Sequence, residues 1–258
     1  MTKKLLILIF FALIVILLFR VENNHANQTR SLTPIATPTE STKTPELIGP
    51  PDSISPSESP SNTPLPTTPP TVGLPAKISI EMPFTTQAPH TNWDALHEDA
   101  CEEASLIMVM HYINNTKITS KESAEEEILQ MVKWETENEL GYSITLQQLI
   151  EVAKHYGIKT ARIGTANKEK IQKELSDGKP VIVPAAGREL DNPNFKTPGP
   201  LYHMLVIKGY DKNGWITNDP GTRKGEGFRY TYDNLLNAIH NWDANDINNG
   251  AKEYMVID

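Results

Sequence analysis

Hydrophobic and polar residues follow different patterns on the two sides of residue 77. Beyond it, apolar residues recur at helical or strand spacing between polar turns, which is typical of a folded domain. Before it, the chain has one unbroken apolar run and then a long segment with few aliphatic residues. We therefore predict an N-terminal apolar segment at 1–26, a linker at 27–76 and a folded domain at 77–258.

Helices are predicted to come first in the folded domain, and strands mostly later. The segments Thr119 to Glu122 and Thr145 to Gln148 both have the pattern of a capping box, and Asn167 can cap a further helix. The expected elements are helices from 101 and at 119–134, 145–157, 167–177 and 232–242, and strands at 78–82, 158–163, 180–184, 201–210, 214–217 and 253–257. This order predicts an α+β fold in which N-terminal helices pack on an antiparallel sheet.

The N-terminal apolar run, 5–19, is flanked by Lys3, Lys4 and Arg20. Such a segment is typical of a signal peptide or a membrane anchor. It is shorter than the roughly 20 residues of a spanning helix, but flanking basic side chains can extend it. No clear small-residue cleavage site follows, which favours an uncleaved single-pass anchor in the cell membrane over a secreted protein. The lysines before the run predict that the folded domain lies outside.

Ser, Thr and Pro dominate the predicted linker. A segment of this composition buries too little apolar surface to offset its chain entropy, so we expect an extended, disordered spacer. The net charge of the chain is −8, which argues against nucleic acid as a partner. Neither a zinc-binding spacing nor a phosphate-binding glycine loop is present, and no metal or cofactor is predicted. The sequence indicates no oligomeric state.

Cys101 is the single cysteine of the chain and stands where a polar loop gives way to an apolar helical run. A thiol in the first turn of a helix faces unpaired N–H groups and the positive end of the helix dipole, which favour the nucleophilic thiolate. The alternative is a small buried hydrophobic residue. The core-facing side of this helix is expected to consist of Leu106, Val109, Met110 and Ile113.

A second group of candidate residues lies about a hundred positions downstream. His203 begins an apolar strand, and a turn and a second strand lead to Asn218-Asp219-Pro220-Gly221. Antiparallel pairing would place Asp219 beside His203, where a carboxylate fixes the tautomer of the imidazole. Cys101 would then be the nucleophile and His203 the base. Asn218 is the alternative partner, although neighbouring side chains on a strand point to opposite faces.

The order of these pieces resembles that of the C39-like cysteine peptidases. The matching pieces are Cys-Glu-x-Ala-Ser-Leu from 101, Lys-Pro-Val-Ile-Val from 179, His-x-Leu-Val-Ile-x-Gly-Tyr-Asp from 203 and Asn-Asp-Pro-Gly from 218. The resemblance covers about residues 78–258 and implies a papain-like fold with a triad of Cys101, His203 and Asp219. It also implies that Gln87 donates to the oxyanion, while His97 or Glu98 could line the same cleft.

The chain departs from this pattern beside the thiol. Glu102 and Glu103 stand where the peptidase domains of bacteriocin exporters have Gly-Pro. Carboxylates that face the sulfur would raise its pKa, whereas carboxylates that point away would stabilise the helix. The segment 187–200, rich in Gly, Pro and Asn, is predicted to be a surface loop that borders the cleft and helps to set specificity.

The predicted function is that of a membrane-tethered, extracytoplasmic cysteine peptidase or amidase of bacterial origin. Its substrate would be a peptide or protein, cleaved at a peptide or isopeptide bond. Two alternatives remain open at this point. The first is an inactive binding module at the cell surface, and the second is an acyl transferase of the transglutaminase type, which shares the triad order.

Overall fold

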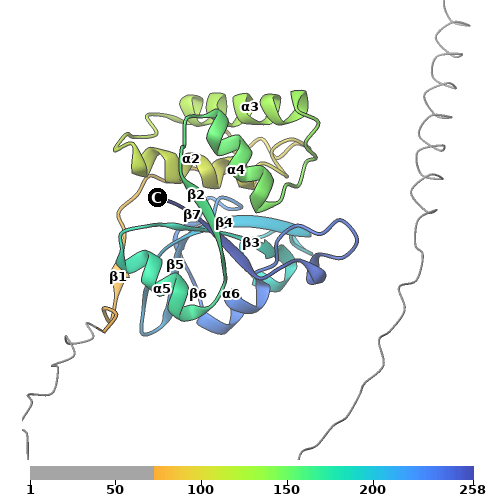
Figure 1. Ribbon diagram of the computed structural model, residues 1–258. Coiled ribbons are helices and arrows are strands. Elements are labelled where there is room, and N and C mark those ends of the chain that lie inside the picture. The colour runs from red at the N-terminus through yellow and green to blue at the C-terminus, as the bar shows by residue number, and fades with distance from the viewer. Residues whose placement is uncertain (1–72) are drawn as a thin grey trace, which may run out of the picture. The chain divides into compact units, whose positions relative to one another are not determined.

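A computed structural model describes residues 73–258 of the chain (Figure 1). The predicted membrane segment at 1–26 and nearly all of the predicted linker at 27–76 lie outside the described residues. Within the described part, no helix combines the length and the apolar character needed to span a membrane.

The described residues form a mixed structure of helices and one antiparallel sheet. The helices are α2 (Cys101–Ile113), α3 (Lys121–Glu137), α4 (Leu146–His155), α5 (Lys168–Ser176) and α6 (Tyr232–Ala238), with short 3-10 turns η1 (Gly187–Leu190) and η2 (Ile247–Asn249). The strands are β1 (Ile78–Ser79), β2 (Ala161–Thr165), β3 (Val181–Ala186), β4 (Tyr202–Asp211), β5 (Gly214–Asn218), β6 (Glu226–Tyr230) and β7 (Glu253–Ile257). The α+β character predicted from the sequence is therefore confirmed.

The sheet has seven strands in the order β2-β7-β3-β4-β5-β6, and β1 pairs with β4 off this path. All the pairings are antiparallel. Figure 1 shows α2, α3 and α4 on one side of the sheet, with α5 and α6 on the other. Every residue of β3 is buried, as expected for a central strand that is covered on both faces.

Helix α2 is more deeply buried than its sequence pattern suggested. Its first nine residues are all buried, because α3 and α4 cover it on one side and β4 on the other. The prediction of a single core-facing side was therefore too narrow, and it was wrong for Ile113, which is 38% exposed. A helix buried on all sides shows little amphipathic periodicity, which is why the pattern was a poor guide here.

The helix starts follow the capping signals closely. Thr145 and Gln148 form the predicted capping box, and the Asn167 side chain accepts a hydrogen bond from the N–H of Lys170. In α3 the cap is Ser120 rather than Thr119, and its reciprocal partner is Ser123. The predicted hairpin is present as β4 and β5, with Asp211 opposite Gly214.

The C-terminal region differs from the prediction in two places. The last helix ends at Ala238 rather than near residue 242, because Ile239 forms a bridge with Ala185 and the His240 N–H donates to Pro184. Strand β6 was missed altogether, although it pairs with β5 along its length. Only its last residue, Tyr230, is buried, so it carries little of the apolar alternation that marks a strand.

The close approach of β1 to β4 yields a test of the fold. A Cβ at Gly209 would lie 2.2 Å from the carbonyl oxygen of Ile78, so Gly209→Ala should push β1 away. We expect a loss of about 1–3 kcal/mol in the free energy of unfolding, measured by denaturant titration. The matched control is Gly73→Ala, whose added Cβ meets nothing within 4 Å and should leave stability unchanged. Equal stability of both variants and wild type would contradict the strand packing described here.

Candidate active site

The centre of the candidate site is a buried pair of side chains, His203 and Asp219. His203 is the second residue of β4, and Asp219 immediately follows β5, so the hairpin brings the two together. The Nε2 atom of His203 lies 2.8 Å from Oδ1 of Asp219, and both residues are at most 1% exposed. Asn218, the alternative partner, instead donates to the carbonyl of Pro83 and accepts from the N–H of Gly227.

Three further donors converge on the Asp219 carboxylate. The N–H of Gly221 donates to Oδ1 at 2.9 Å, while Tyr230 Oη and Asn192 Nδ2 donate to Oδ2 at 2.5 and 3.0 Å. Asn192 Nδ2 also donates to the Tyr230 oxygen at 2.7 Å. Oδ1 therefore has partners from β4 and from the turn after β5. Oδ2 has partners from β6 and from the segment between β3 and β4.

These contacts keep Asp219 ionised although it is buried. Burial alone would raise its pKa, but the charge and hydrogen bond of His203, with the donors Tyr230 and Gly221, outweigh burial and hold the pKa below its usual value. The pKa of Tyr230 is shifted in the opposite direction. Burial and the neighbouring carboxylate raise it and keep the hydroxyl protonated. An ionised Asp219 requires a proton on Nε2 of His203, which leaves Nδ1 as the nitrogen that can accept a proton.

The imidazole is also held by packing. The Phe195 ring lies edge-on to it with centroids 5.1 Å apart. A Cβ at Gly221 would lie 2.8 Å from Cε1 of His203, so this position leaves room for the ring only because it is glycine. The segment 187–200 contacts His203 through Phe195, and Asn192 within it is buried, whereas the sequence predicted a surface loop.

Cys101 is the first residue of α2 and is only 3% exposed. Its Sγ donates to Oε2 of Glu102 at 2.9 Å, and the Ile144 N–H donates to the other Glu102 oxygen at 3.2 Å. The sulfur also faces the backbone N–H of Met204, the residue after His203. The thiol therefore lies next to the His203 backbone but is hydrogen-bonded to Glu102.

The resting state of this thiol is neutral. Burial raises the pKa of Cys101 well above its usual value, and the charge and hydrogen bond of Glu102 raise it further, against a lowering by the Met204 N–H. The sequence had left open whether the two glutamates face the sulfur, and Glu102 does. Burial also raises the pKa of Glu102, to about 8, and the charge of Glu103 contributes to this shift.

Gln87 braces the loop that leads into α2. Its Nε2 donates to the carbonyls of His97 and Glu98 at 2.8 and 3.0 Å, and its own N–H donates to the carbonyl of Pro220. Gln87 thus connects the loop before Cys101 to the turn after Asp219. To donate to an oxyanion, as the family resemblance implies, it would have to release one of these carbonyls. His97 is buried between Asp94 and Glu125, while Glu98 is exposed.

Sequence reasoning missed Asn192 and Tyr230, the two donors to Oδ2 of Asp219. Tyr230 lies on the strand that the pattern did not predict, and Asn192 lies in a segment that the composition marked as a surface loop. The available signal was chemical, because a buried carboxylate needs more donors than one imidazole can supply.

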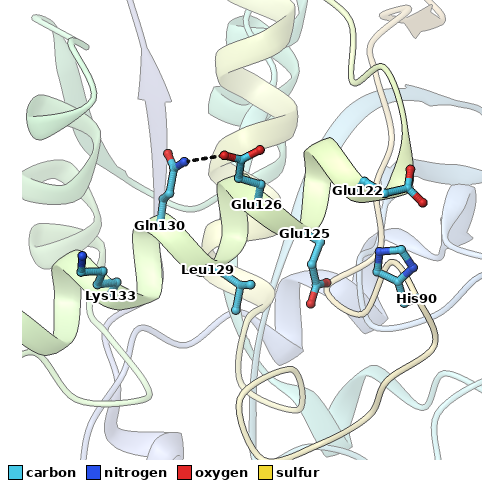
Figure 2. A pocket seen from close by; sticks show the side chains of 7 residues that line it. All are labelled: His90, Glu122, Glu125, Glu126, Leu129, Gln130 and Lys133. Atoms are coloured by element: carbon cyan, nitrogen blue, oxygen red, sulfur yellow. Dashed lines mark hydrogen bonds between the residues drawn. The ribbon is translucent and has the colours of Figure 1, made fainter.

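A hollow of about 460 Å³ lies away from these side chains. It follows α3 (Figure 2), where the Gln130 amide donates to Glu126. Its lining residues are His90, Glu122, Glu125, Glu126, Leu129, Gln130 and Lys133. None of them is a predicted catalytic residue.

Comparison with known proteins assigns the family. The model of the Peptidase_C39 like family matches residues 79–246, well over half of the chain, so the protein belongs to this family. A solved structure described as a C39-like peptidase from Bacillus anthracis has 18% sequence identity and a TM-score of 0.48, with 70% of this chain and 98% of that chain covered. A comparison with curated proteins gives no match.

The buried Glu102 predicts a specific dependence of stability on pH. The folded protein keeps the Glu102 proton up to about pH 8, whereas the unfolded chain releases it near pH 4.5. The unfolded state thus binds fewer protons between these values, and stability should fall as pH rises from about 4.5 to 8, by several kcal/mol. In Glu102→Gln this fall should be smaller, as measured by urea unfolding at pH 5, 6.5 and 8.

Glu151→Gln is the matched control, because Glu151 is exposed on α4. It should keep the pH dependence of wild type. If Glu102→Gln and wild type lose the same stability between pH 5 and 8, the carboxyl of Glu102 is not protonated in the folded protein.

Proposed function

We propose that this protein is a cysteine peptidase or amidase that hydrolyses peptide or isopeptide bonds through Cys101, His203 and Asp219. The observation that carries the proposal is the orientation of His203. Asp219 holds the Nε2 side of the ring, which leaves Nδ1 as the proton acceptor, and the Cys101 sulfur lies against the backbone of the next residue, Met204. Membership of the Peptidase_C39 like family supports the same reaction class.

The reaction begins with a rotation of the thiol. Cys101 Sγ leaves Glu102 and transfers its proton to Nδ1 of His203. The thiolate attacks the substrate carbonyl and forms a tetrahedral oxyanion, which the unpaired N–H groups at the start of α2 can stabilise. Asp219 stabilises the imidazolium that forms in this step.

The second half of the reaction regenerates the thiol. Imidazolium donates its proton to the leaving nitrogen, the C–N bond breaks, and the acyl group remains on sulfur as a thioester. His203 then removes a proton from water, and the resulting hydroxide attacks the thioester. When the C–S bond breaks, the carboxylic acid leaves and the sulfur regains its proton from His203.

A second candidate function is a binding module with the same fold and no turnover. The observation that favours it is the buried, neutral thiol, which donates to Glu102 instead of to His203. In this case Glu102 is a permanent partner of the thiol, whereas in the peptidase it is a partner of the resting state only.

We further propose that the domain acts outside the cell, tethered by the segment at 1–26. The support is the sequence pattern given above, with basic residues before an apolar run. A cysteine introduced at an exposed position, as Glu151→Cys in the Cys101→Ala protein, should react with a membrane-impermeant maleimide on intact cells, since Cys101 itself is buried. Labelling that requires cell lysis would place the domain inside.

The single cysteine also allows a direct test of the chemistry. We expect the full-length protein to react with iodoacetamide while folded, and to cleave members of a peptide library followed by mass spectrometry. Cys101→Ala should lose both properties, and His203→Gln should lower kcat/KM by about 10²–10⁴-fold, because it removes the proton acceptor. Products that contain new amide bonds to added amines would indicate acyl transfer.

Two outcomes would overturn the peptidase. The first is a folded wild-type protein that reacts with iodoacetamide only in denaturant, which favours the binding module. The second is cleavage that persists in Cys101→Ala. Thermal melting of each variant shows that loss of activity is not loss of fold.

A further inference from the structure

A second cavity opens at the N-terminal end of α2, and acidic side chains lie within it. Its volume is about 220 Å³. Leu96, Val132 and Leu140 form apolar walls, and the carboxyl groups come from Asp99, Glu103 and Glu135. The cavity thus combines a hydrocarbon lining with a cluster of acidic groups.

Two of these carboxyl groups are buried and hydrogen-bonded to each other, which leaves one oxygen of each without a donor. Glu103 is 3% exposed and Glu135 is 4% exposed. Oε2 of Glu103 and Oε1 of Glu135 have no hydrogen-bond donor within residues 73–258, and neither residue forms an ion pair with a lysine, arginine or histidine of that part of the chain. Buried carboxyl groups normally have such partners, because an unpaired one costs several kcal/mol.

In the unliganded protein, protons neutralise this pair of carboxyl groups. Burial raises the pKa of Glu103 well above its usual value, and the charge and hydrogen bond of Glu135 raise it further. Burial likewise raises the pKa of Glu135, to about 7. Asp99, Glu103 and Glu135 line the cavity, but no three His, Cys, Asp or Glu side chains of the described residues are spaced so that they could hold a metal ion, and the geometry favours an organic cation.

We propose that this cavity is a specificity subsite that binds the ammonium group of a lysine-like side chain in the substrate. The three N–H donors of an ammonium group would satisfy the free carboxyl oxygens of Glu103 and Glu135. Leu96, Val132 and Leu140 would contact the methylene stem, which is apolar along its whole length. An uncharged isostere such as norleucine would leave the carboxyl groups unpaired.

The position of the cavity defines where in a substrate the lysine would lie. Glu103 is two residues after Cys101, so the two side chains leave nearly opposite sides of α2, Glu103 toward α3 and Cys101 toward β4, across a helix roughly 10–12 Å wide. The ammonium site is therefore about 10–15 Å from the thiol. An extended peptide advances about 3.3 Å per residue, so the lysine should lie about three to five positions from the cleaved bond. This part of the inference rests on the proposed peptidase function.

Binding can be measured without turnover in the full-length Cys101→Ala protein. The probes are Nα-acetyl-L-lysine amide and Nα-acetyl-L-norleucine amide, which differ in the ammonium group, with affinities from NMR titration. We expect the lysine probe to bind about tenfold more tightly or better. Glu103→Gln and Glu135→Gln should each remove most of this preference, and Glu151→Gln, at an exposed position, should keep it.

Equal affinity for the two probes in Cys101→Ala overturns the subsite, whether or not the glutamine variants fold. A preference that survives in folded Glu103→Gln and Glu135→Gln overturns it as well. In the peptide-library digest, lysine should be enriched near the cleaved bonds for wild type and not for Glu103→Gln. If the lysine probe is preferred but no peptide is cleaved, the ammonium site stands and the peptidase proposal fails.

Discussion

A buried negative charge on Asp219 is the constraint on which the site depends. Such a charge is tolerated only when donors surround it, and here an imidazole, a phenol, an amide and a backbone N–H do so. The donors come from β4, from β6 and from the connections before β4 and after β5. The same contacts that stabilise the charge of Asp219 therefore hold the sheet and the 187–200 segment together and orient the His203 ring.

The other half of the site is organised by burial of acid groups around α2. The helix begins at Cys101, and its next two residues are buried glutamates, the first bonded to the thiol and the second facing Glu135. In the absence of a substrate these groups remain largely protonated, and the sulfur remains a neutral thiol. A substrate ammonium group would lower the pKa values of Glu103 and Glu135 and pair with the carboxylates that form. Substrate recognition would thus depend on the protonation of this cluster.

Much of this arrangement could be predicted from the sequence, because the decisive signals are local. Capping residues marked the starts of α4 and α5, and the hairpin alone was enough to place Asp219 beside His203. What escaped prediction depends on contacts between distant segments. Tyr230 and Asn192 reach Asp219 only in the folded chain, and Glu135 meets Glu103 only because α3 packs on α2. The position of the Glu102 carboxyl, toward the thiol or away from it, could not follow from a helical pattern either.

The most direct test of the account is the tautomer of His203. Nitrogen-15 NMR of histidine-labelled protein at neutral pH distinguishes Nδ1 from Nε2, and the His203→Gln variant identifies the resonances among the seven histidines of the chain. The account predicts a proton on Nε2, where it is shared with Asp219, and an Nδ1 resonance that shifts when Cys101 is alkylated. A proton on Nδ1 with a bare Nε2, or an Nδ1 resonance unaffected by alkylation, would contradict the pairing of these three side chains.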